Sequence, residues 1–224
     1  MKPLLMVALI VSASVLGQDG GAETRRHSVD EQVRAAGQKL LASLTDQLSQ
    51  TERAKERVER ASGVIDVLKK RAKEEADRDG KQSNNLQTAS TEILKQLYES
   101  LSEAYIAATK VRDELRSSYF PEKEKSIVVL KAKLDSYREN DPDRAVWVDV
   151  YRDLVEVVEN IKQQERRLDQ NCARLNAVLA DLRNRMNAFA TYKQVVLDST
   201  KLLKVLGDLN TALESMAKKL GPDA

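Results

Sequence analysis

An unbroken heptad repeat runs from Trp147 to Leu203, a stretch that contains no proline or glycine. Alternating steps of four and three residues visit seventeen positions in it, and fourteen of these are apolar. Since 42% of the chain is hydrophobic, chance would place about seven apolar residues there. A strict 3.5-residue repeat keeps its apolar residues on one side of a supercoiled helix. The sequence therefore predicts a long coiled-coil helix in this region.

The composition agrees with helices and argues against an ordinary compact core. Charged residues make up 32% of the 224 residues, whereas aromatic residues make up only 4%. Compact cores depend on aromatic side chains for buried area, and a charged chain with helical periodicity is typical of long helices. No stretch shows the alternation of a β-strand. The fold class we expect is all-α.

The first 17 residues differ from the rest and predict a signal peptide. Lys2 is the only charged residue before Asp19, and the apolar stretch ends with Val15 and Gly17 at positions −3 and −1 of a cleavage site before Gln18. An uncleaved anchor is the weaker interpretation, because the apolar stretch is shorter than the roughly 20 residues that span a bilayer. We therefore expect an exported protein, periplasmic or secreted, with no stable membrane insertion after signal removal.

Breaks in the helical pattern divide the remaining chain. Residues 18–27 are polar and are expected to form a disordered leader. Ser28 and Glu31 match a capping box that would begin the first helix. Pro121 interrupts the second helical stretch as either a kink or a tight turn. Pro142, preceded by Asp141, has the pattern of the first residue of the last helix.

These breaks define three helical arms of similar length, at about residues 28–78, 86–139 and 142–220. Short connections between arms favour antiparallel neighbours, which bury the three apolar stripes against one another. The architecture we predict for residues 28–220 is an elongated antiparallel three-helix coiled-coil bundle.

The chain offers little for catalysis, metal binding or cofactor binding. His27 is the only histidine and Cys172 the only cysteine. A zinc site needs three or four converging ligands, and no phosphate-binding or nucleophile motif is present. We expect neither an enzyme nor a cofactor. Cys172 occupies a heptad core position, where an inert buried thiol is favoured over an intermolecular disulfide.

Several residues are candidates for a partner surface. Val128 and Val129 make their helical segment apolar on most sides. Trp147 would close the end of the bundle or serve as an interface anchor. Glu165 and Lys193 interrupt the heptad stripe and would pair with charges on neighbouring helices or extend to solvent. We favour solvent for these two charges.

The function that best fits these features is a non-catalytic exported coiled-coil scaffold or interaction protein of the cell envelope. Its partners would be other proteins, including a second copy of the chain. A periplasmic holdase-type chaperone for unfolded envelope proteins is the alternative. Without Lys2 the chain has 36 basic and 35 acidic residues, which disfavours nucleic-acid binding. A membrane-remodelling helical bundle is a third and weaker interpretation, because no segment after the signal is long and apolar enough.

Overall fold

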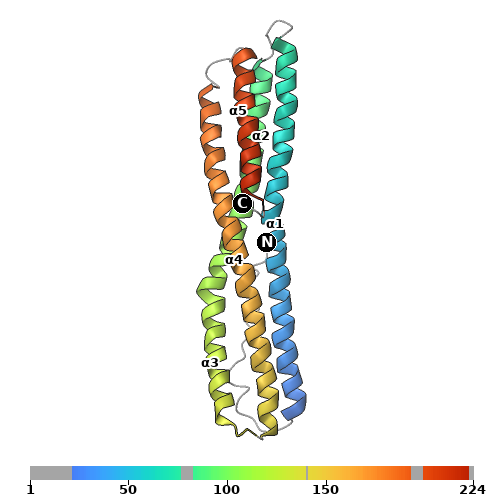
Figure 1. The fold of residues 1–224 in the computed structure, drawn as a ribbon, viewed down its shortest axis with the longest axis vertical. Helices are drawn as coiled ribbons and strands as arrows, with labels where there is room; N and C mark the ends of the chain where they lie inside the picture. The colour runs from blue at the N-terminus through green and yellow to red at the C-terminus, as the bar shows by residue number, and fades with distance from the viewer. Residues whose placement is uncertain (1–21, 77–82, 140, 193–198, 222–224) are drawn as a thin grey trace. The chain divides into compact units, whose positions relative to one another are not determined.

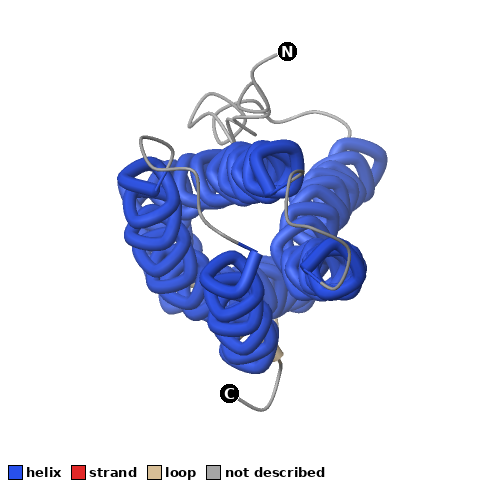
Figure 2. Tube along the Cα trace, turned by 90° about the horizontal axis from the view of Figure 1, so that it is seen from above, coloured by secondary structure: helices blue, strands red, loops and turns tan. Residues whose placement is uncertain are grey.

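The computed structural model describes residues 22–76, 83–139, 141–192 and 199–221. Within these ranges the elements are all helices and no strand occurs (Figures 1 and 2). In chain order they are α1 (Ala22–Ala76), α2 (Ser83–Glu114), the π-helix η2 (Leu115–Tyr119), α3 (Phe120–Ser136), α4 (Pro142–Tyr192) and α5 (Ser199–Lys219). The predicted all-α class is confirmed. The predicted cleavage site between Gly17 and Gln18 lies outside the described residues.

The chain divides into two compact units, and both α1 and α4 contribute residues to each. Unit 1 comprises residues 1–46 and 111–167, and unit 2 comprises residues 47–110 and 168–224. The start of α1, η2, α3 and the first half of α4 therefore belong to unit 1. Unit 2 contains the remainder of α1, most of α2, the second half of α4 and all of α5.

In unit 1, α3 and α4 run antiparallel. Arg116 contacts Glu165, Glu124 contacts Lys162, and Lys133 lies over Trp147. Residue numbers on α4 therefore decrease as those on η2 and α3 increase. A small apolar cluster joins the two helices. Its buried members are Leu130, Val150, Leu154 and Val158.

Helix α1 packs parallel to α4 in unit 1, and a glycine lets the two approach closely. Arg34 forms an ion pair with Asp153, which is buried. One turn further, a Cβ atom on Gly37 would lie 2.6 Å from Cγ1 of Val157. Real Cβ atoms essentially never lie so close to another atom. Glycine weakens a helix, but at position 37 it is the residue that leaves room for the Val157 side chain.

Unit 2 holds the larger core, and α5 supplies much of it. Nδ2 of Asn171 donates to Oγ1 of buried Thr51 at 2.9 Å, which fixes α4 against α1. Ser62 Oγ lies 2.6 Å from Oδ1 of Asn210, which fixes α1 against α5. The buried residues from α5 are Leu202, Leu206, Leu209, Leu213, Met216 and Ala217.

The expected continuous third arm, residues 142–220, is wrong. Helix α4 ends at Tyr192, and α5 begins at Ser199 and returns along α4. Arg174 donates to the carbonyl of Gly221 at 2.8 Å, and Lys219 pairs with Asp181 at 3.1 Å. These contacts join residues 47 and 38 positions apart, which is possible only if the two helices are antiparallel. The antiparallel return of α5 is favoured because it buries the apolar face of α5 against the other helices of unit 2.

The N-terminal expectation was also wrong. Helix α1 begins at Ala22 rather than at Ser28, so residues 22–27 are helical and are not part of a disordered leader. The segment contains alanine, glutamate and two arginines, which are all strong helix formers. The capping-box pattern at Ser28 and Glu31 therefore lies inside the helix. In contrast, α4 begins at Pro142 as expected, with the amide of Arg144 donating to the carbonyl of Asp141 at 3.0 Å.

Pro121 is neither a helix end nor a tight turn. The backbone stays helical through Tyr119 and Phe120, and the amide of Phe120 donates to the carbonyl of Leu115, five residues earlier. A proline has no amide hydrogen and clashes with the preceding turn of an α-helix. One turn of π-helix before Pro121 accommodates this misfit, so that the backbone remains helical from Leu115 into α3.

The π-helix places Tyr119 where high pH should destabilise the protein. Burial, and secondarily the charge of Glu122, raise the pKa of Tyr119 to about 12 from its usual 10.0. Because the folded state keeps its phenol proton to a higher pH than the unfolded chain, the contribution is intact below pH 10 and is lost between about pH 10 and 12. We expect Tyr119→Phe to flatten the loss of stability in this range, measured by urea unfolding at several pH values. An unchanged pH profile in the variant would contradict it.

Candidate interaction surfaces

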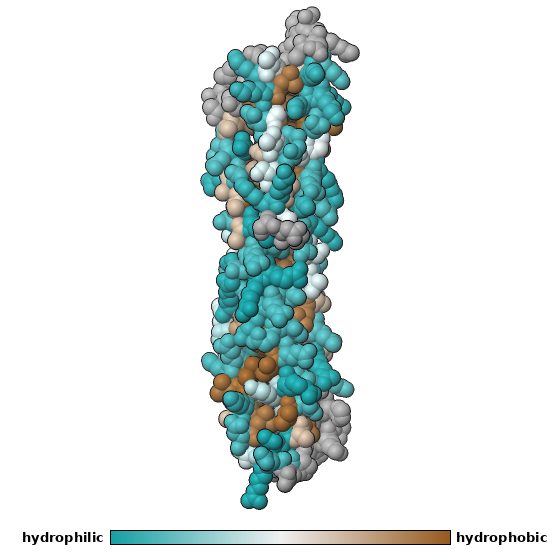
Figure 3. Space-filling view, viewed as in Figure 1, coloured by the Kyte–Doolittle hydropathy of each residue, from teal (hydrophilic) through white to brown (hydrophobic). Residues whose placement is uncertain are grey.

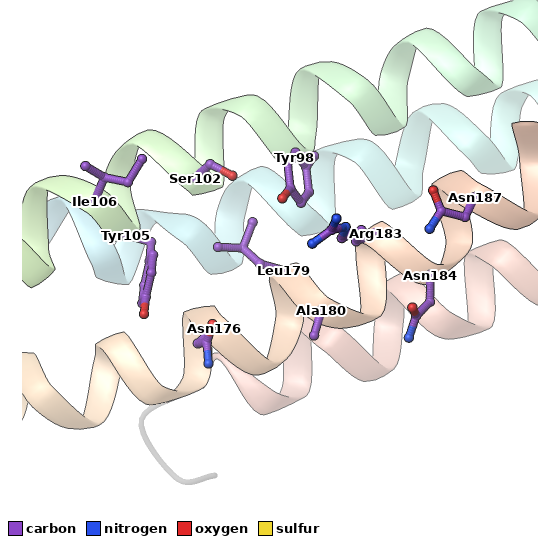
Figure 4. Close-up of a pocket in the computed structure, with 10 residues that line it drawn as sticks. All are labelled: Tyr98, Ser102, Tyr105, Ile106, Asn176, Leu179, Ala180, Arg183, Asn184 and Asn187. Carbon is purple, nitrogen blue, oxygen red and sulfur yellow. The ribbon is translucent and has the colours of Figure 1, made fainter.

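A groove lies between α2 and α4 on the surface of unit 2 (Figure 4). Its volume is about 680 Å³. Helix α2 contributes Tyr98, Ser102, Tyr105 and Ile106, and helix α4 contributes Asn176, Leu179, Ala180, Arg183, Asn184 and Asn187.

The groove follows from the residue spacing on the two helices. On α4, positions 176, 180, 183, 184 and 187 recur with helical periodicity and therefore share one face. Ala180 has a small side chain that leaves space between the helices, and Leu179 behind it is 8% exposed. On α2, Ile106 is 64% exposed and adds an apolar side chain at the edge of the groove. The groove thus combines an apolar base with aromatic and amide walls.

Most polar side chains in the groove have no partner among the residues that the structure describes. Asn187 has an interaction within the chain. The side chains of Tyr98, Tyr105 and Arg183 form no hydrogen bond or ion pair with other residues of the described ranges, and the same holds for Ser102, Asn176 and Asn184. Tyr98 and Arg183 extend from opposite helices into the space between them (Figure 4). These groups are therefore available to a bound partner.

Sequence analysis missed this groove. All of its α4 residues except Leu179 lie between the heptad positions, which the apolar repeat does not describe. The available signal was composition: three asparagines and one arginine occupy a face on which coiled coils usually carry glutamate and lysine.

The two valines predicted for a partner surface are exposed in unit 1. Val128 is 67% exposed and Val129 is 54% exposed, both on the side of α3 away from the apolar cluster. Val148, on α4, is 39% exposed. Brown apolar surface is visible over the region of α3 and the start of α4 in Figure 3.

Trp147 is only partly available. It packs against the unit 1 cluster, and Nζ of Lys133 lies 3.8 Å from the centre of its ring. A cation at this position is attracted to the negative face of the indole. The structure therefore places Trp147 in a contact between α3 and α4 of its own unit.

Glu165 does not belong to a surface, and the expectation that it reaches solvent was wrong. It is 6% exposed, and Nε of Arg116 donates to its carboxylate at 2.6 Å. A buried carboxylate requires such a partner, because desolvation of an unpaired charge is costly. The alternative of pairing with a neighbouring helix is therefore correct for Glu165. Lys193 lies outside the described residues.

Cys172 is 1% exposed in the unit 2 core, where Oγ1 of Thr109 lies 3.9 Å from its sulfur. An intermolecular disulfide would require this core to open. Among the described residues, no group of three or more histidine, cysteine or carboxylate side chains is arranged to hold a metal ion.

Comparisons with known proteins add little to this description. No protein-family model matches the chain, and no curated protein matches it. The chain is similar to a solved structure described as a computationally designed three helix bundle, with 13% identity, coverage of 88% of this chain and 92% of that chain, and a TM-score of 0.25. Within the described ranges, no helix has an apolar stretch that could span a membrane.

Proposed function

We propose that the protein is an exported, non-catalytic interaction protein of the cell envelope that binds a protein partner in the groove between α2 and α4. The observation that carries the proposal is the set of groove side chains without partners in the described ranges: Tyr98, Ser102, Tyr105, Asn176, Arg183 and Asn184. The long heptad repeat supports a coiled-coil arrangement for the helices that carry the groove.

The composition of the groove is the strongest support for a protein partner. Tyrosine and arginine are enriched where binding energy concentrates in protein interfaces. Serine and asparagine provide adaptable hydrogen bonds beside rigid aromatic rings, as they do in antibody paratopes. Ile106, which is 64% exposed, adds an apolar contact. The groove therefore offers apolar, aromatic and amide contacts in a single site.

Export and the absence of catalysis remain parts of the proposal. Export is supported by the signal-peptide pattern before Gln18. A non-catalytic role is supported by the paucity of chemistry in the sequence, which has one histidine and one cysteine, the cysteine being buried.

The proposal can be tested by quantitative capture from native envelope extracts. The bait is the tagged wild-type protein, compared with a Tyr105→Ala, Arg183→Glu double variant. Both side chains line the groove; Arg183 is exposed, and Tyr105 is only partly buried against the core. Circular dichroism of the purified variant should therefore show a folded helical protein. We expect one or a few partners that the wild type enriches and the double variant loses at least about tenfold, the effect of removing roughly 1.4 kcal/mol of binding energy.

A matched control removes an exposed side chain elsewhere. Val129→Ser changes an exposed residue of α3 in unit 1 and should leave this partner set unchanged. Loss of the partners in the control but not in the groove variant would refute the groove as the binding site.

A holdase is a second candidate, favoured by the exposed Val128 and Val129, which would offer apolar contacts to unfolded chains. This alternative predicts a broad set of unfolded envelope clients whose capture is reduced by Val129→Ser and unaffected by the groove substitutions.

A further inference from the structure

One face of α1 in unit 2 is exposed and has an unusual centre. Val64 and Val67 are 46% and 48% exposed, and Gly63 lies beside them. Charged residues flank this centre on the same helical face. In chain order the face, called here the Gly63 face, contains Arg53, Glu56, Arg60, Gly63, Val64, Val67, Arg71 and Glu74, of which all are exposed.

Gly63 has no explanation within the chain. A glycine inside a helix costs about 1 kcal/mol relative to alanine. Gly37 is explained by its close contact with Val157, but a Cβ atom on Gly63 would meet nothing within 4 Å. Gly63 is also not a helix end, since α1 continues to Ala76. A glycine that leaves space on an exposed face is suited to the close approach of another molecule.

The order of charges on this face is self-complementary. If a second copy of α1 lies antiparallel across a two-fold axis between Gly63 and Val64, Glu56 faces the second copy's Arg71. In the same register Arg53 faces the second copy's Glu74, and the aliphatic part of Arg60 faces Val67. Each pairing occurs twice by symmetry, as required for an isologous interface. Opposite charges therefore meet at both ends of an apolar centre.

A pair of like charges lies near this register. Arg57 and Lys70 would approach each other at the edge of the interface. However, Arg57 Nη1 donates to the carbonyl of Ser100 at 3.1 Å, which holds this guanidinium on its own chain. Lys70 has only an exposed pair with Asp66 at 3.3 Å, so its flexible side chain can turn away from the interface. Glu56 has only an exposed contact of 3.5 Å with Arg60, which is a weak pair. Glu56 can therefore turn to a second copy at little cost.

We propose that the protein forms an antiparallel homodimer through the Gly63 face of α1, with a second copy of this chain as the occupant. The contact extends from Arg53 to Glu74, a helix length of roughly 33 Å. Because a single helix from each copy contributes, the dimer is expected to be reversible and concentration-dependent. The proposal is independent of the groove between α2 and α4.

Sedimentation equilibrium tests whether the dimer forms. The protein is expressed with its native N-terminus, so that any cleavage of the predicted signal peptide takes place. We expect a monomer–dimer equilibrium for the wild type. Glu56→Arg, which places two arginines against each other, should raise the dissociation constant at least about tenfold. Adding Arg71→Glu exchanges the two charges and should restore the dimer. Glu99→Arg, which breaks a comparable exposed pair with Lys95 on α2, should have no effect.

Gly63→Ala provides a test in which folding and association change in opposite directions. Because the Cβ position is open in the monomer, the substitution should raise the urea midpoint of unfolding in dilute protein. The same substitution should weaken the dimer about tenfold, because two added methyl groups meet at the axis.

The register can be tested with introduced cysteines, since Cys172 is buried. Gly63→Cys should form a disulfide-linked dimer under mild oxidation. Arg53→Cys alone should not, because its two copies would lie roughly 30 Å apart, whereas a mixture of Arg53→Cys and Glu74→Cys proteins should crosslink. A wild type that stays monomeric at all concentrations, or a dimer unaffected by both Glu56→Arg and Gly63→Ala, would overturn the proposal.

Discussion

Leu206→Ala is expected to lower the free energy of unfolding by about 2–5 kcal/mol, the range measured for leucines truncated in a packed core. Leu206 is fully buried in the unit 2 core, where α5 packs against other helices. The loss combines the transfer free energy of the removed methyl groups with the cavity that remains. Urea unfolding followed by circular dichroism measures the difference.

Leu203→Ala is the matched control for this substitution. Leu203 lies on the same helix but is only partly buried, so its truncation should cost clearly less. A continuous third arm with an unbroken heptad register would place Leu203 inside and Leu206 outside the seam. A larger loss for Leu203→Ala than for Leu206→Ala would therefore contradict the packing of α5 described above.

Arg116→Met is expected to cost about 2–3 kcal/mol because it leaves the Glu165 carboxylate buried without its charged partner. Glu165 is 6% exposed and receives a hydrogen bond of 2.6 Å from Arg116. The cost is set below that of a fully buried pair because the Arg116 side chain is 48% exposed. Urea unfolding again measures the change.

The double variant Arg116→Met, Glu165→Met separates the charge effect from general damage. Replacing both members of a buried pair by apolar residues is often neutral, so most of the lost stability should return. Lys95→Met serves as a control, since Lys95 is 57% exposed in its pair with Glu99, which is also exposed, and its loss should cost under about 1 kcal/mol. If the double variant is as unstable as Arg116→Met, unpaired charge is not the cause.

Periodicity predicted the interior of α4 well because burial there follows one repeating rule. Leu154, Val158, Ile161, Leu168 and Leu175 were predicted core positions and all are buried. The start of α4 at Pro142 was also predictable, since proline tolerates the first turn of a helix and little else.

The return of α5 could not be found in the same way. A heptad repeat records which face of a helix is apolar but not whether the chain reverses between two repeats. No proline or glycine lies between Trp147 and Leu203 to signal a break. Leu202 and Leu206 are four residues apart and could form an apolar face of their own, just as Leu203 fits the heptad repeat. Only burial in the folded protein shows that Leu202 and Leu206 face the core.

The candidate site was less predictable than the fold. Val128 and Val129 were identified because they make their helical segment apolar on most sides. Most groove residues, in contrast, are polar side chains at positions outside the apolar repeat. Polar side chains are expected at such positions, so these residues do not stand out in the sequence. Tyr98 and Arg183 come from different helices, and their proximity depends on the register between α2 and α4, which the heptad pattern leaves open.

Site-specific photocrosslinking from position 106 tests the groove most directly. Ile106 lines the groove and is 64% exposed, so a photoreactive amino acid placed there in the living cell should lie against any partner that binds. We predict a discrete crosslinked product from position 106 that is absent when Arg183→Glu is added, and no such product from a probe at position 129. A product from position 129 with none from position 106 would contradict the assignment of the α2–α4 groove as the binding site.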